Sequence, residues 1–440
     1  MRRRPDRSMR RAMSKRRAVV VGGARTPFVR AFAELTELDT IALGCAAVRG
    51  LLERTNVARD EVDAIVWGGV LLPGLAPNVG REIALDLRMP GVEAMTVTRA
   101  CASGLQAITT AAAAIERGDA DVVIAGGSDS TSNAEVKLPQ KLIHAAAPLA
   151  FGKATFGDVL GMLSQLVPIT ELLPRMPKVA ERTTGQVMGE AAEEMARRNE
   201  ISRAAQDELA ARSHQRAAAA IATGRFADEV IPLQAPDGRW VHTDRIVRGD
   251  TNASALAKLR PVFAKDGTLT AGNSTPLTDG AAAVLLMEED IAKSLGVTPL
   301  AAIDSWAYVA VDPADQLLMG PALAVPKALD RAGMALADID LVDLHEAFAA
   351  QVLSVLKMLG SDAFARARLG RDRAVGEVDP ERLNVHGGSI AIGHPFAATG
   401  ARMVTTMANE LHRTGKRTAL LGICAAGGLG AAAVLRHPSS

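Results

Sequence analysis

The sequence predicts an α/β fold built from two similar halves. One pattern occurs twice, a helix end followed by a short loop and an apolar strand, at residues 51–66 and again at 328–343. A second pair of matching segments, 101–104 and 397–400, opens two alanine-rich helices. Because helices alternate with strands, we expect largely parallel sheets that are covered by helices.

Further elements follow from glycine placement and apolar runs. The two alanine-rich helices should end near Gly118 and Gly415, where a left-handed C-cap favours glycine. Apolar strands are expected at 122–127 and 281–287. Residues 418–435 carry no charge, but their glycines favour a buried strand, turn and strand over a membrane span.

Residues 137–265 differ in sequence pattern from the two halves and lack the repeat. Ser202 can cap an alanine-rich helix that runs towards Gly224, and prolines then break the chain into loops. We interpret this stretch as an insertion over the active-site face. The predicted organisation is a basic disordered tail (1–17), an N-terminal half (18–136 plus 266–295), an inserted loop domain (137–265) and a C-terminal half (296–440).

Composition excludes several classes of function. The chain has 440 residues, and its 50 Lys and Arg against 49 Asp and Glu give no global attraction for nucleic acid. Its three cysteines include no C-x-x-C pair, so neither a disulfide framework nor a structural zinc site is expected. The apolar run after the basic tail is too short for a secretory signal. We therefore expect a cytoplasmic protein with reduced thiols.

Cys101 is the first candidate for chemistry, because it lies where a strand passes into a helix. A helix N-terminus stabilises a thiolate, which is the nucleophilic form of cysteine. A free cysteine is as often a small buried hydrophobic residue, so its position alone does not decide between the two interpretations.

His394 changes that balance. By the internal repeat it lies just before the position equivalent to Cys101, so a pseudo-twofold axis would bring a base to the thiol. Cys424 follows an apolar strand in a glycine-rich turn. A second thiol can be chance packing. Beside an oxyanion site, however, it could move a proton to or from a carbon next to a carbonyl, which is carbon–carbon bond chemistry.

The combination of C-A-S-G-L at Cys101, G-H-P at His394 and the cysteine-glycine turn at Cys424 resembles the thiolase family. The likeness runs from about Val19 to Leu435. It implies an acyltransferase with a five-layer α-β-α-β-α arrangement of duplicated halves and an inserted loop domain. It also implies that Cys101, His394 and Cys424 form the catalytic set.

Two motifs differ from those of short biosynthetic thiolases. The sequence has H-E-A-F at 345–348 in place of N-E-A-F, and C-A-A-G-G at 424–428 in place of C-x-G-G-G. Both variants resemble the thiolase (beta) subunit of the trifunctional fatty-acid oxidation complex. In the family the asparagine helps to hold a water at one oxyanion hole, and the resemblance implies that His345 could do so through a ring N–H. It also implies that the backbone N–H groups of Cys101 and Ala426 form the other oxyanion hole.

The implied function is that of a 3-ketoacyl-CoA thiolase of fatty-acid beta-oxidation, which cleaves 3-oxoacyl-CoA through an acyl-Cys101 intermediate with ping-pong kinetics. Coenzyme A is the co-substrate. No permanently bound cofactor is expected, and no metal, because no histidine or carboxylate cluster has ligand spacing. The residues expected to line the pantetheine and acyl path are Met188, Ser274, Thr275, Ala347 and Phe348. Met188 and Phe348 are alternatively ordinary core residues.

Other functions and partners stay open at this point. The same residues would serve acetoacetyl-CoA synthesis. A ketoacyl synthase of the same fold would use a cysteine with two histidines, but Cys424 argues against it. A non-catalytic lipid-binding or scaffold subunit is a third alternative.

Expected partners are a second copy in a homodimer or homotetramer and a hydratase-dehydrogenase alpha subunit. The amphipathic stretch within 142–176 is either buried in the assembly or touches a partner subunit or the membrane surface.

Overall fold

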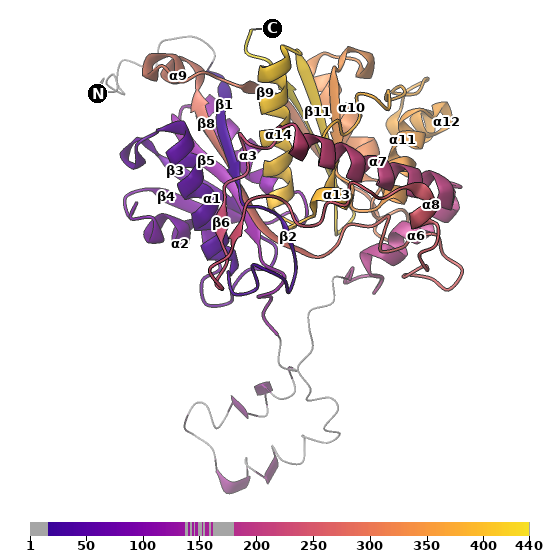
Figure 1. Cartoon of the computed structure of the whole chain (residues 1–440), viewed down its shortest axis with the longest axis horizontal. Helices are drawn as coiled ribbons and strands as arrows, with labels where there is room; N and C mark the ends of the chain where they lie inside the picture. Colours follow the sequence, from indigo (N-terminus) through magenta and orange to yellow (C-terminus); the bar gives the residue numbers. More distant parts are fainter. Residues whose placement is uncertain are drawn as a thin grey trace. The chain divides into compact units, whose positions relative to one another are not determined.

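The computed structural model describes residues 16–136 and 180–439, with isolated positions between 140 and 161 (Figure 1). The chain forms two compact units, Met1–Asn133 with Ala180–Ser440, and Ala134–Val179. The predicted amphipathic stretch falls in the second unit and lies mostly outside the described residues, as does most of the predicted basic tail. Residues 180–265 belong to the first unit, and the division into an inserted domain stays a prediction.

A ten-stranded sheet organises the first unit. Its order is β10-β11-β12-β9-β1-β8-β5-β3-β4, and β2 pairs with β8. The strands are β1 (Ala18–Arg25), β2 (Val29–Arg30), β3 (Ala64–Gly68), β4 (Glu93–Val97), β5 (Val122–Asp129), β8 (Thr278–Glu288), β9 (Ala301–Ala310), β10 (Leu341–Leu344), β11 (Thr418–Ala425) and β12 (Leu429–Arg436). The short strands β6 (Leu233–Gln234) and β7 (Trp240–Val241) pair separately. Only Val19–Ala302 and Val20–Ala301 pair β1 with β9, so this narrow seam divides the sheet into two halves.

The expectation of largely parallel strands is wrong in part. Strand β3 is parallel to β4 and β5, and β10 is parallel to β11. All other pairs of the large sheet are antiparallel. The physical reason is visible at β11 and β12, where a tight turn in place of a helical crossover joins the strands as a hairpin.

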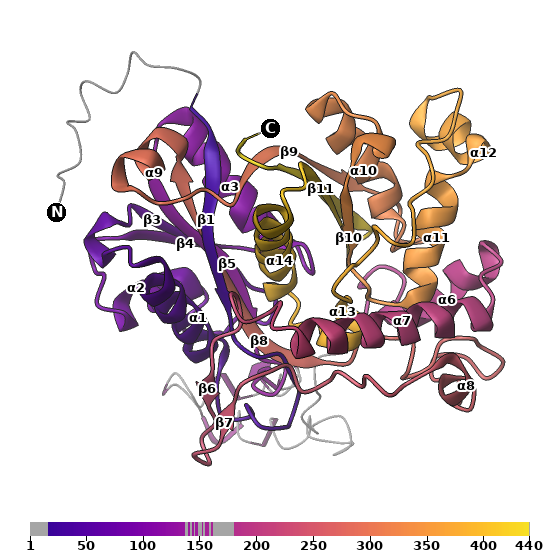
Figure 2. The same cartoon turned by 45° about the horizontal axis from the view of Figure 1, so that its top comes forward.

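The helices complete five layers, which confirms the predicted fold class (Figure 2). Helices α1 (Thr40–Thr55) and α2 (Val79–Asp86) cover one face of the N-terminal strands, and α10 (Gly320–Ala332) and α11 (Ala349–Leu359) lie on the outer side of the C-terminal strands. Helices α3 (Ser103–Arg117) and α14 (Ala398–Thr414) form the central layer, and their apolar side chains share a core with both halves of the sheet. The remaining elements are η2 (Arg59–Glu61), α6 (Met188–Arg198), α7 (Arg203–Ala222), α8 (Ala253–Leu256), α9 (Glu289–Leu295), η4 (Leu336–Asp338), α12 (Asp362–Phe364), η5 (Ala365–Leu369) and α13 (Ser389–Ile392).

The helix ends lie where the sequence predicts them. Gly118 and Gly415 cap α3 and α14 with φ values of 84° and 68°, which glycine adopts without steric cost. The Ser202 side chain accepts a hydrogen bond from the backbone N–H of Ala205 and so starts α7. None of the helices in the described part of the chain is long and apolar enough to cross a membrane.

Two glycines let the central helices meet. A Cβ atom on Gly104 would overlap the carbonyl oxygen of Ala397, and one on Gly400 would overlap the backbone nitrogen of Leu105. Gly104 and Gly400 occupy equivalent positions of the internal repeat. The helix starts that carry the two candidate site segments are therefore in contact, as the repeat predicts.

Replacing Gly104 with alanine should lower the free energy of unfolding by about 1–3 kcal/mol, because the obstructing atoms are backbone and cannot rotate away. Urea denaturation measures this change. Gly91→Ala is the control, since its Cβ would meet nothing within 4 Å, and it should change stability by less than about 0.5 kcal/mol. Equal effects of both substitutions would contradict the close approach.

Candidate active site

Cys101 lies in the sharp connection between β4 and α3 and keeps part of its surface exposed. The preceding Ala100 has a φ of 46°, in the left-handed region that side chains other than glycine rarely adopt. The Ser103 hydroxyl holds this turn: it donates to the Ala100 carbonyl at 2.6 Å and accepts from the Arg99 N–H at 2.7 Å. The strand-to-helix placement of the thiol is thus as predicted, and the turn that aims it is strained.

Two histidines from other segments reach the same place. His345 directly follows β10, and His394 lies between α13 and α14. Their ring centroids are 4.1 Å apart, and one ligand atom each of Cys101, His345 and His394 lies within 4.8 Å of the others. The structure therefore brings together the predicted nucleophile, Cys101, the predicted base, His394, and His345, for which the sequence predicts a role at an oxyanion hole.

Buried hydroxyl groups hold both imidazole rings. His394 Nδ1 lies 2.6 Å from Thr399 Oγ1, and His345 Nδ1 lies 2.9 Å from Ser389 Oγ. The Nε2 atoms of both histidines are buried and have no hydrogen-bond partner. Each ring is thus fixed through one nitrogen and keeps the other for a reacting group.

A dry environment keeps these groups neutral. Burial raises the pKa of the Cys101 thiol to about 12, and hydrogen bonds from the backbone N–H groups of Ala426 and Cys101 oppose this rise. Burial, with a smaller contribution from the positive charge of Arg402, lowers the pKa of His394 to about 3. The pKa of His345 is lowered by the same two causes and by His394. A neutral thiol therefore faces two neutral imidazoles at pH 7.

This charge state predicts how Cys101 reacts with an alkylating reagent. Because only the thiolate is nucleophilic and its pKa is raised, the rate of iodoacetamide alkylation should rise steadily from pH 7 to pH 10. Mass spectrometry of the Cys101 peptide measures this rate. A plateau with a midpoint below pH 7 would instead demonstrate a preformed thiolate–imidazolium pair.

The cysteine-glycine turn after β11 completes the site. Gly427 and Gly428 have φ values of 81° and 68°, and this turn directs the Ala426 N–H to the Cys101 sulfur. Cys424 is buried, and its pKa is raised well above the usual value by burial and by the nearby Cys101 charge. Glu181, which the sequence analysis missed, accepts a hydrogen bond from the Gly427 N–H at 3.0 Å.

Four of the five predicted substrate residues lie side by side. Ser274 pairs with Phe348 as an isolated β-bridge, and the Thr275 N–H donates to the Ala347 carbonyl at 3.0 Å. Met188 begins α6 and packs against the apolar cluster that contains Phe348. Their contact with coenzyme A stays a prediction.

A buried carboxylate ties the 180–265 stretch to the catalytic loops. Glu346 accepts hydrogen bonds from Ser213 of α7 and from Asn384, both at 2.6 Å. The same Ser213 oxygen accepts from the Gly388 N–H at 2.9 Å. Helix α7 therefore fixes the loops that carry His345 and Ser389.

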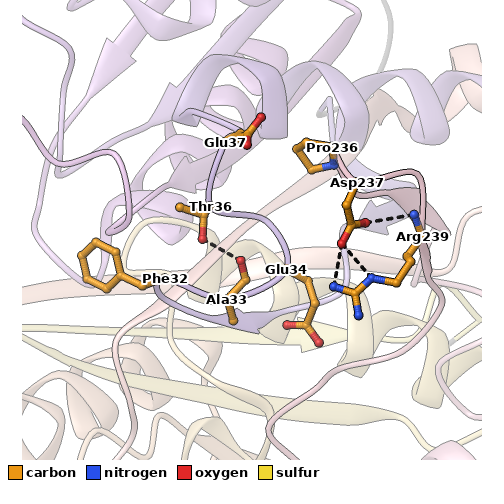
Figure 3. Close-up of a pocket in the computed structure, with 8 residues that line it drawn as sticks. All are labelled: Phe32, Ala33, Glu34, Thr36, Glu37, Pro236, Asp237 and Arg239. Atoms are coloured by element: carbon orange, nitrogen blue, oxygen red, sulfur yellow. Dashed lines mark hydrogen bonds and ion pairs between the residues drawn. The ribbon is translucent and has the colours of Figure 1, made fainter.

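A surface hollow elsewhere contains none of these residues (Figure 3). Arg239, its one cation, is paired with Asp237. The other carboxylates would repel the phosphates of coenzyme A, so the hollow does not fit that ligand. Its lining residues are Phe32, Ala33, Glu34, Thr36, Glu37, Pro236, Asp237 and Arg239.

Comparison with known proteins decides the family. The model of the thiolase N-terminal domain matches residues 18–290, and that of the thiolase C-terminal domain matches residues 297–437. The chain belongs to the thiolase family. It is 47% identical over 429 residues to a 3-ketoacyl-CoA thiolase of Vibrio cholerae, covering 97% of this chain and 98% of the relative. It is 46% identical to that of Alteromonas mediterranea, with 95% and 96% coverage.

Solved thiolase structures share the fold. The Bacillus anthracis acetyl-CoA acetyltransferase superposes with a TM-score of 0.83 at 31% identity, over 96% of this chain and 99% of that one. Human mitochondrial 3-ketoacyl-CoA thiolase in complex with CoA gives a TM-score of 0.80 at 30% identity, with 96% and 98% coverage. These likenesses confirm the predicted family.

Behind His345 of this thiolase lies a polar chain that the sequence analysis missed. Arg402 pairs with Asp343 at 2.9 Å and donates to Ser389 Oγ at 3.5 Å, and all three residues are buried. Because its oxygen accepts from Arg402, the Ser389 hydroxyl can donate its hydrogen to His345 Nδ1. That bond would place the ring hydrogen on Nε2, as a donor to the substrate. Ser389 lies five residues before His394 in the sequence, and no sequence signal pairs it with His345.

Replacing Ser389 with alanine should lower kcat about 5–10-fold, the effect of losing one hydrogen bond. The loss should vanish in a His345→Asn background, because asparagine needs no tautomer to donate. A double-mutant cycle on kcat measures this coupling. Additive losses would show that Ser389 acts independently of His345.

Proposed function

We propose that this chain is a 3-ketoacyl-CoA thiolase that works in the degradative direction. The convergence of Cys101, His394, His345 and Cys424 carries the proposal, because each group has one task in breaking a carbon–carbon bond. The full-length relatives named 3-ketoacyl-CoA thiolase support it, and the human structure with CoA supports coenzyme A as co-substrate.

In the first half-reaction, His394 Nε2 takes the thiol proton and the Cys101 sulfur attacks the 3-keto carbon of 3-oxoacyl-CoA. The backbone N–H groups of Cys101 and Ala426 stabilise the tetrahedral oxyanion. The bond between C2 and C3 then breaks and leaves an acyl group on Cys101. Nε2 of His394 and of His345 stabilise the departing enolate of acetyl-CoA, and Cys424 gives it a proton.

In the second half-reaction, coenzyme A regenerates the enzyme. Its thiol loses a proton to the Cys424 thiolate and attacks the acyl-Cys101 thioester. The Cys101 sulfur then leaves and recovers its proton from the His394 imidazolium. Both cysteines and His394 return to their starting states, so the kinetics should be ping-pong.

The test is the thiolysis rate against 3-oxoacyl-CoA chain length from about four to sixteen carbons, with Cys101→Ala as the blank. A rate that rises towards medium or long chains and disappears in the blank supports the proposal. Activity confined to the four-carbon substrate would favour acetyl-CoA C-acetyltransferase instead, the activity for which the similar Bacillus anthracis protein is named. No turnover at any length would favour a scaffold subunit.

A homodimer or homotetramer is part of the proposal. Strand β4 lies at the end of the sheet and exposes 42% of Met95, a surface that a second copy could cover. A hydratase-dehydrogenase subunit and a membrane surface are further proposed partners, through residues 142–176. Light scattering with and without such a subunit measures the assembly.

A further inference from the structure

The catalytic groups also form a set of metal ligands. Among the residues that the structure describes, Cys101, His345 and His394 are the one group of three potential ligands close enough to share an ion, with their ligand atoms within 4.8 Å of one another. Sequence spacing gave no hint of this site, because the three residues come from three separate segments.

Both histidines have an Nε2 atom that could bind a metal ion. His345 and His394 are 0% and 3% exposed, and their Nε2 atoms are buried without a partner. The Thr399 hydroxyl can accept an Nδ1–H from His394. Zinc binding at Nε2 of His345 would move that ring's hydrogen to Nδ1, and the Ser389 hydroxyl would turn to accept it. A ligating histidine usually makes such a bond with its second nitrogen, because it fixes the ring and the tautomer.

One thiolate and two neutral imidazoles suit zinc. Zinc takes sulfur at about 2.3 Å and nitrogen at about 2.0–2.1 Å, often with three protein ligands and an open fourth position. Tetrahedral ligands at these lengths lie about 3.3–3.8 Å apart. The ligand atoms, which lie within 4.8 Å of one another, would therefore have to approach by up to roughly 1 Å when an ion binds.

The surrounding charges permit a dication. The thiolate neutralises one positive charge of the ion. Arg402 is already paired with Asp343 at 2.9 Å. The carboxylate of Asp129 is near enough to Cys101 to raise its pKa. Cys101 keeps part of its surface exposed, whereas both histidines are buried.

We propose that Cys101, His345 and His394 form a reversible zinc site that holds the enzyme inactive by occupying its nucleophile. Binding displaces one proton, from the Cys101 thiol to solvent, and involves no redox step. His345 is the deciding ligand, since an asparagine at its position would leave only a cysteine and one histidine. Zinc binding itself needs only the three ligands, whereas the inactivation rests on the proposed role of Cys101 as nucleophile.

The first test is direct binding to the full chain after chelator treatment. Calorimetry with Zn²⁺ should give one ion per chain, and Co²⁺ should give a sulfur-to-cobalt charge-transfer absorption band. Cys101→Ala and His345→Asn should each weaken binding by more than the roughly 10–100-fold that loss of a second-shell partner costs. Circular dichroism confirms that both variants are folded.

Matched controls identify the ligands. Cys45→Ala removes another thiol, and His412→Ala removes an exposed histidine of α14; both should bind as the parent protein does. Zn²⁺ should also slow iodoacetamide alkylation of Cys101 in the parent but much less in His345→Asn. Unchanged affinity in His345→Asn, a missing sulfur band or loss of binding in Cys45→Ala would each overturn the proposal.

Discussion

Replacing His394 with alanine should lower the thiolysis rate by about 10⁴-fold or more. In the proposed mechanism His394 both takes the Cys101 proton and donates to the enolate, and such tasks contribute about 10²–10⁴-fold and 10²–10³-fold. His345 is a poor replacement among the described neighbours, because Ser389 holds its ring and burial lowers its pKa well below the usual value. Rapid-quench measurement of the acyl-enzyme should show that both half-reactions fall.

The control for this prediction is His412→Ala, which removes an exposed histidine from the same helix region. It should keep the rate of the parent protein. A His394 variant that loses less than tenfold would show that another group takes the thiol proton. Loss of only the second half-reaction would assign His394 to the attack by coenzyme A alone.

Replacing Cys424 with alanine should separate carbon–carbon cleavage from simple acyl transfer. The rate of thiolysis should fall by about 10²–10⁴-fold, because the enolate loses its proton donor. Exchange of an acyl group between labelled coenzyme A and a saturated acyl-CoA forms no enolate. Cys424 would serve exchange only in proton transfer with the coenzyme A thiol, so the exchange rate should fall less than the cleavage rate. The raised pKa of Cys424 keeps it protonated until the enolate forms, which is the state that this role requires.

Both rates can be followed on one preparation by liquid chromatography of the CoA esters. Cys45→Ala is the matched control, since Cys45 is a buried thiol beside Asp86 and not in the site. Equal losses in cleavage and exchange would assign Cys424 to the nucleophilic step. No loss in either would make it a packing residue.

The parts of the fold that could be predicted are those with a local sequence signal. The internal repeat predicted the two matching halves. The glycine C-caps predicted the ends of α3 and α14, and the Ser202 cap predicted the start of α7. The mixed strand directions could not be foretold, since alternation of helix and strand does not show which strands become neighbours.

The residues of the candidate site likewise fall into those with a local sequence signal and those without one. Cys101, His394 and Cys424 stand in motifs with glycine or a helix start beside them. Ser389, Arg402 and Glu181 act through side-chain contacts between distant segments, and no local pattern encodes those pairings. The shared position of His345 and His394 likewise depends on how two loops pack together.

The close approach of α3 and α14 that Gly104 and Gly400 allow makes the two halves depend on each other. One copy of the repeated segment carries the proposed nucleophile, Cys101, and the other carries the proposed base, His394. Neither copy can be lost, and neither can regain the other's residue without disabling the pair. A chain cut in the 296–300 linker would therefore yield two inactive fragments, and activity would return only when the fragments reassociate.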